Sequence, residues 1–112
     1  MEKKIQELYQ NLVKISAGYL IYQKRNNIEL MRKMMPQIQE FVLWFLEGNI
    51  FGIEETLYQN MSQDILGILE DIVAAMEQGD RVLMQDAMAY GLLEYLELFI
   101  ESEQEDGKND NI

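Results

Sequence analysis

The chain has 112 residues, of which 48% are apolar and 26% are charged, and it contains neither cysteine nor histidine. A chain of this length is expected to form one domain, and its apolar content is too high for an intrinsically disordered protein. The missing residue types exclude disulfides, zinc sites built on cysteine or histidine, thiol nucleophiles and Ser-His-Asp triads.

Charge is distributed unevenly along the chain. Nine Lys and Arg against twenty Asp and Glu give a formal net charge of −11, which argues against nucleic acid and anionic membranes as partners. Residues 1–33 carry a local charge of +4 (seven cations, three acids), whereas residues 34–112 carry −15 (two cations, seventeen acids). We expect the two parts to attract each other, within one fold or between two copies, unless they are merely solvated helix faces.

The first helix is expected over about residues 2–24, because apolar residues recur there at alternating intervals of three and four. The stripe consists of Ile5, Leu8, Leu12, Ile15, Tyr19 and Tyr22.

The N-terminus lacks the apolar segment of a signal peptide. The most apolar stretch, residues 82–100, contains four polar side chains and is therefore not a membrane span. We expect a cytoplasmic protein.

A second helix is predicted over about residues 28–47 by the same spacing, and Pro36 should kink it or divide it in two. Gly48 and Asn49 are expected to end this helix in a left-handed cap, with Ile50 making the accompanying apolar contact. The segment 50–53 is too apolar for a solvated loop, so we expect it to cover one end of the core.

The third helix is predicted to begin near residue 54 and to run to about residue 78, with Ser62 as a possible internal N-cap that would divide it. Gly79 and Asp80 predict a left-handed cap followed at once by the N-cap of a fourth helix, over about residues 81–101. Gly67 and Gly91 lie twelve residues on either side of Gly79. They predict a close approach of the last two helices, unless Gly91 only makes room for a neighbouring tyrosine.

Four helices joined by short turns favour an all-α, up-down-up-down four-helix bundle, with a kinked second helix. We expect residues 1–101 to form the helical bundle domain and residues 102–112 to form a disordered acidic tail. The fourth helix offers more apolar surface than one side of a four-helix core can cover. A homodimer is therefore predicted.

Acidic side chains are the only plentiful reactive groups. Two pairs, Glu77 with Asp80 and Glu94 with Glu97, flank the last turn, and paired carboxylates can bind divalent cations. They keep a small metal-dependent phosphohydrolase as an alternative function. The first pair straddles a turn and cannot project from one helix face, so no catalytic residue, metal site or cofactor is predicted.

Methionine is more abundant than usual, with eight residues. Flexible thioether side chains suit surfaces that accept varied apolar partners, although core filling is their ordinary role. We predict a non-enzymatic, protein-binding bundle, a chaperone-like adaptor, whose partner is an amphipathic helix with basic flanks. The predicted partner-binding residues are Met31, Met34, Met35, Trp44 and Phe51. A self-assembling structural protein is the other alternative.

Residues 71–94 (DIVAAMEQGDRVLMQDAMAYGLLE) resemble the C-terminal hairpin of a family of small bacterial all-helical proteins without an established activity, and residues 40–46 resemble the second helix of that family. The chain departs from that pattern at Ala89 and Gly91, where the family prefers glutamate. Size, acidity and the Gly-Asp turn are also similar to those of flagellar export chaperones. Both resemblances imply an all-helical fold, and neither transfers a functional residue.

Overall fold

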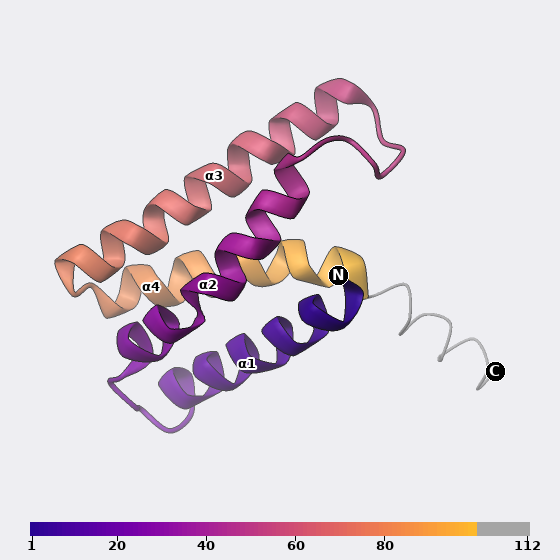
Figure 1. Cartoon of the computed structure of the whole chain (residues 1–112). Helices are drawn as coiled ribbons and strands as arrows, with labels where there is room; N and C mark the ends of the chain where they lie inside the picture. The colour runs from indigo at the N-terminus through magenta and orange to yellow at the C-terminus, as the bar shows by residue number, and fades with distance from the viewer. Residues whose placement is uncertain (101–112) are drawn as a thin grey trace.

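The computed structural model describes residues 1–100, which fold into four helices without a strand in that range (Figure 1). The last helix consists of two α-helical segments joined by a π-helical turn, and we call all three together the fourth helix. The bounds are α1 Glu2–Leu20, α2 Asn27–Leu46, α3 Glu55–Gln78, α4 Arg81–Ala87, the π turn η1 Met88–Leu92, and an α-helical segment over residues 93–100. The predicted all-α, four-helix fold is confirmed, and the predicted tail lies outside the described residues.

The fourth helix occupies the centre of the molecule. Within it, α4 packs against α2 and α3, and η1 packs against α1 and α3. Its buried apolar side chains include Met84, Met88, Leu92 and Leu96, each at most 2% exposed. The other three helices of the same chain cover most of this apolar surface, whereas Val82, Tyr90 and Leu98 remain more than half exposed. The homodimer itself stays a prediction.

Two divisions of helices that the sequence left open do not occur. The helix α2 continues through Pro36, and α3 continues across Ser62. A proline inside a helix costs about 3 kcal/mol. Pro36 lies on the exposed side of α2, while the side chains of Met31 and Ile38 on the same helix are fully buried. Burial of this apolar face outweighs the loss of one hydrogen bond, so the helix is not divided.

The turn between α3 and α4 forms as predicted. Gly79 has a left-handed backbone with φ of 65°, and the Asp80 side chain accepts a hydrogen bond of 3.0 Å from the Leu83 backbone N–H. The Asp80 N–H donates to the Ala75 carbonyl at 2.9 Å, which satisfies one of the free carbonyls at the end of α3. Capping of both helices makes this a tight hairpin.

The end of α2 differs from the prediction. Among the described glycines only Gly52 and Gly79 have positive φ, so Gly48 does not form a left-handed cap. Ile50 is 72% exposed and makes no capping contact. The Asn49 side chain closes this connection instead, because its Nδ2 donates to the Ile53 carbonyl at 2.7 Å.

The segment 50–53 covers one end of the core, as predicted. The Phe51 ring stacks on Phe45 with centroids 5.0 Å apart, and the Phe45 ring also stacks on Tyr58 at 5.5 Å. The Tyr58 hydroxyl donates to the Phe45 carbonyl at 2.7 Å. Seven aromatic side chains gather at this end: Phe41, Trp44, Phe45, Phe51, Tyr58, Tyr95 and Phe99.

The two glycines predicted to face each other behave differently. A Cβ placed on Gly91 would lie 2.9 Å from Ile68 Cγ1, whereas a Cβ on Gly67 would meet nothing within 4 Å. The close approach is thus confirmed at Gly91 and wrong at Gly67. Gly91 belongs to the π turn, whose wider winding shifts the facing of side chains relative to a regular α-helix. Gly67 and Gly91, which are equally far from Gly79 in the sequence, therefore do not point toward each other.

Candidate binding groove

A groove runs between α1 and α2 and contains two adjoining hollows, which share Asn11 and Met34. We call the first the outer hollow; it has a volume of about 190 Å³ and is lined by Met1, Lys4, Ile5, Glu7, Leu8, Asn11, Met34, Gln37, Glu40 and Phe41. We call the second the basic hollow; it has a volume of about 330 Å³ and is lined by Asn11, Lys14, Ile15, Gly18, Tyr19, Lys24, Asn26, Asn27, Leu30, Lys33 and Met34.

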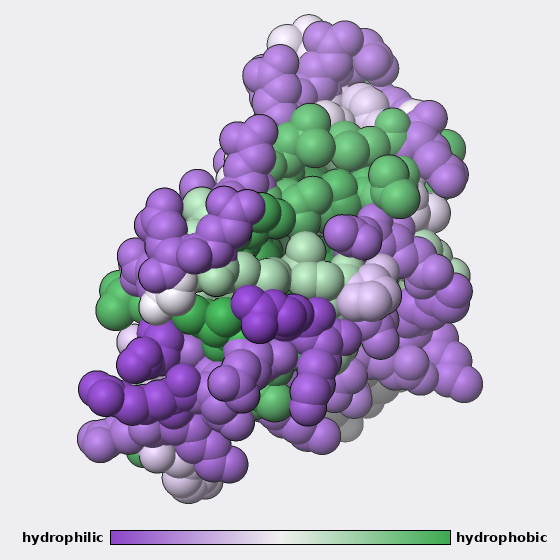
Figure 2. Space-filling view, turned by 60° about the vertical axis from the view of Figure 1, so that its left-hand side comes forward, coloured by the Kyte–Doolittle hydropathy of each residue, from purple (hydrophilic) through white to green (hydrophobic). Residues whose placement is uncertain are grey.

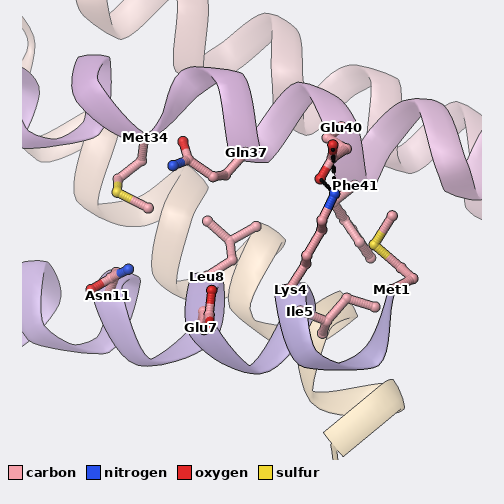
Figure 3. A pocket seen from close by; sticks show the side chains of 10 residues that line it. All are labelled: Met1, Lys4, Ile5, Glu7, Leu8, Asn11, Met34, Gln37, Glu40 and Phe41. Carbon is pink, nitrogen blue, oxygen red and sulfur yellow. Dashed lines mark hydrogen bonds and ion pairs between the residues drawn. The ribbon is translucent and has the colours of Figure 1, made fainter.

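The outer hollow has an apolar floor and a rim of mixed charge. Ile5, Leu8 and Phe41 form the floor and are at most 2% exposed. The Lys4 ammonium and the Glu40 carboxylate approach to 3.1 Å across the rim (Figure 3). Such an exposed ion pair contributes at most about 1 kcal/mol. Since both signs of charge are present, this hollow does not select a partner of one charge.

The basic hollow carries charge of one sign. Lys14, Lys24 and Lys33 come from α1, from the connection and from α2, and none of the described residues that line the hollow is acidic. Ile15, a buried residue, provides part of the floor. A ligand that fits must combine acidic groups for the rim with an apolar side for the floor.

The connection between α1 and α2 positions Lys24. The helix α1 ends at Leu20, four residues before its predicted end, and Gln23 then adopts a positive φ of 54°. The Lys24 N–H donates to the Gly18 carbonyl at 3.0 Å. Lys24 Cδ lies 3.6 Å from the position that a Cβ on Gly18 would take. The lysine stem therefore lies along the end of α1, where Lys24 lines the basic hollow.

Three consecutive apolar residues project at the tip of this connection. Leu20, Ile21 and Tyr22 are 63%, 70% and 71% exposed, although Tyr22 was predicted to belong to the buried stripe of the first helix. The early end of α1 turns them away from the core. Exposed apolar surface beside cations is typical of an interaction site, and we call these three residues the apolar tip.

Two buried amides connect the groove to the fourth helix. Asn27 lines the basic hollow and is 1% exposed, and its Nδ2 donates to the Arg81 carbonyl at 3.0 Å. Gln85 is 4% exposed, and its Nε2 donates to Ser16 Oγ at 2.7 Å. These bonds join the start of α2 to the start of α4, and α1 to α4, so both helices of the groove are hydrogen-bonded to the fourth helix.

The five predicted partner-binding residues do not form one surface. Met31 is fully buried and belongs to the core, while Met34 lines both hollows and Met35 is half-buried against the core. Trp44 and Phe51 are half-buried and pack edge-on with ring centroids 5.3 Å apart. Met34 and Trp44 are ten residues apart on α2, which is about 15 Å along its axis. Of the predicted residues, Met34 alone lines the groove.

The predicted partner with basic flanks would need acidic side chains beside Met34, but of the two hollows that Met34 lines, the basic hollow has three lysines and no acid among its described lining residues. These lysines were not recognised as a site, since they come from three separate segments. The local charge of +4 over residues 1–33 was their only signal in the sequence.

The four acids considered for a metal site do not converge. The Glu97 carboxylate accepts a hydrogen bond of 3.1 Å from the Tyr9 hydroxyl, and the Asp80 carboxylate caps α4. Within residues 1–100 no group of three acidic side chains could hold a metal ion. We also find, in the same range, no helix whose length and apolar content would let it cross a membrane.

Apolar surface also occurs away from the groove, and Figure 2 shows a face on which apolar side chains gather between hydrophilic margins. Along α3, a shallow hollow of about 310 Å³ is lined by Leu69, Glu70, Val73, Ala74 and Glu77. We call these five residues the α3 shelf. It is apolar along its middle and acidic at its margin.

Comparisons of the chain with protein-family models, with curated proteins and with solved structures found no match. Neither resemblance noted in the sequence gains support from them.

Proposed function

We propose that this protein works by binding another protein, as a chaperone-like adaptor, and that the groove between α1 and α2 receives an acidic amphipathic helix of that partner. The observation that carries the proposal is the basic hollow, in which Lys14, Lys24 and Lys33 surround an apolar floor. A helix fits because a groove between two helices accepts apolar side chains at intervals of three and four residues.

The apolar tip adds binding energy to the charge of the hollow. Tyrosine is among the residue types that dominate binding energy at protein interfaces, and Tyr22, two residues before Lys24 in the chain, is 71% exposed. The lysines speed encounter with an acidic partner and make its association sensitive to salt. The lysines thus favour an acidic partner, and burial of the apolar tip stabilises the complex.

The proposal is tested by photo-crosslinking in the cells that produce the protein. A photoreactive residue replaces Tyr22 in the apolar tip, and a matched control carries it at Val82, which is comparably exposed on α4 (71% and 61%). We expect an adduct with a second protein from position 22 alone, through an acidic amphipathic segment of that protein. The yield of this adduct should fall about tenfold when Lys14 and Lys33 are both changed to glutamine.

Two outcomes would contradict the proposal. One is equal adducts from positions 22 and 82, which would indicate nonspecific contact. The other is an adduct at position 22 whose yield is unchanged by the loss of both lysines. In either case the basic hollow would not be the binding site.

A further inference from the structure

An acidic and apolar surface that complements the basic hollow lies on the same chain. The helix α3 contains five acidic residues and no lysine or arginine. Residues 14–33, which supply the three lysines of the basic hollow, hold five cations and one acid. Opposite charges are therefore concentrated on two different helical surfaces.

The α3 shelf has the form of the ligand that the groove requires. Glu70, Val73 and Glu77 follow one another at intervals of three and four residues, so they lie on one face of α3. Val73 is 40% exposed, and Leu66, one turn before Glu70, is 42% exposed. The shelf thus presents acidic and apolar side chains together, as an acidic amphipathic helix does.

One molecule cannot bring these two surfaces together. The helices α1 and α3 lie at opposite edges of the fold, and α2 and the fourth helix lie between them (Figure 1). The attraction must therefore act between copies. A contact that joins two different surfaces is heterologous, and it leaves a free groove at one end of a pair and a free shelf at the other.

We infer that the basic hollow of one molecule binds the α3 shelf of a second copy, so that the protein associates head to tail and a partner helix competes with this self-association. The inference rests on the proposed function, because it uses the same hollow. A second copy and a partner helix compete for that hollow. The concentration of the protein therefore regulates how much of it binds the partner.

The net charge of −11 opposes any self-association at low salt. At 0.1 M salt, charges more than about 10 Å apart are largely screened, whereas contacting pairs keep part of their attraction. Association should consequently be strongest at intermediate ionic strength and should weaken again at high salt. A contact driven by apolar surface alone would strengthen steadily with salt.

The test uses two full-length variants. The groove variant carries Lys14→Gln and Lys33→Gln, and the shelf variant carries Glu70→Gln and Glu77→Gln; all four side chains are exposed, so the core is unchanged. Sedimentation velocity at 0.1 M salt is recorded for each variant and for an equimolar mixture. The matched controls are Lys3→Gln with Arg32→Gln, and Glu47→Gln with Glu54→Gln, which change the same charge at exposed positions outside both hollows and the α3 shelf.

We expect the unchanged protein and both controls to form species above twice the chain mass of 13.2 kDa as concentration rises. Each variant alone should self-associate about tenfold more weakly, which corresponds to about 1.4 kcal/mol, since it loses two exposed ion pairs. The mixture should form a dimer and nothing larger, because it contains one intact groove and one intact shelf for each contact.

Three results would overturn the inference. These are a monomer at every concentration for the unchanged protein, variants that associate as strongly as the controls, and a mixture that grows beyond the dimer. A monomer would leave the proposed function standing, provided that the crosslink from position 22 to a different protein is still found. A crosslink to a second copy alone would instead support self-association without an adaptor role.

Discussion

Gly91→Ala is expected to destabilise the fold, although alanine is the better helix former. The added Cβ would lie 2.9 to 3.1 Å from three carbons of Ile68, which is closer than van der Waals contact allows. Isoleucine is stiff at χ1, so relief requires the helices to move. Overpacking costs about 1–3 kcal/mol, and alanine recovers about 1 kcal/mol of helix propensity. A net loss of about 1 kcal/mol in the free energy of unfolding follows, measured by urea denaturation.

Gly67→Ala is the matched control on the facing helix. A Cβ there meets nothing within 4 Å. The free energy of unfolding should therefore increase by about 1 kcal/mol, the full gain in helix propensity. In the Gly91→Ala background, Ile68→Ala should cost much less than it does alone, because it removes the three crowded carbons. Equal stabilisation by both glycine substitutions would show that the close contact at Gly91 does not exist.

Three further predictions concern polar groups. Asp80→Ala should lower the free energy of unfolding by about 1 kcal/mol through loss of the α4 N-cap, with no change in helix content by circular dichroism. Gln85→Met combined with Ser16→Ala should leave thermal stability equal or higher, because it removes the buried Gln85 Oε1, which has no hydrogen-bond partner; a large loss would show that this polar pair is essential. Burial, followed by the hydrogen bond to Asp64, raises the pKa of Tyr95 above its usual range near 10, so its stabilisation is present below pH 10 and is lost as pH rises further. Tyr95→Phe should remove the last tyrosine to ionise in an absorbance titration at 295 nm, and an unchanged titration would contradict the assignment.

Hydrophobic spacing was sufficient to predict the helices, but not their details. The apolar stripes placed α2 and α3 within one or two residues, because burial of one face dominates helix formation. For the first helix, the apolar spacing predicted an end beyond the observed one at Leu20, because Tyr22 continues the spacing although its side chain is exposed to solvent. Nothing in the spacing indicated the π turn, which lies where Gly91 packs against Ile68.

The candidate site was harder to predict than the fold. A cluster of methionines close in sequence suggested one surface, yet Met31 points into the core and Met34 into the groove. Side chains three residues apart on a helix share only part of a face, so their fates depend on which neighbour covers each one. The lysines of the basic hollow come together only through the packing of α1 on α2, which no local pattern encodes.

The charge preference of the groove is the most direct test of the account. Two synthetic amphipathic helices with identical leucine faces, one with glutamate and one with lysine on the polar face, are titrated into the ¹⁵N-labelled protein. We expect the glutamate peptide to shift the amide signals of Lys14, Gly18, Lys24 and Leu30, which line the basic hollow. The affinity for this peptide, obtained from the titration, should fall about tenfold in the variant with Lys14→Gln and Lys33→Gln, since two contacts of up to about 1 kcal/mol are lost. Tighter binding of the lysine peptide, or changes of amide signals confined to α3, would contradict the proposal that the basic hollow binds an acidic helix.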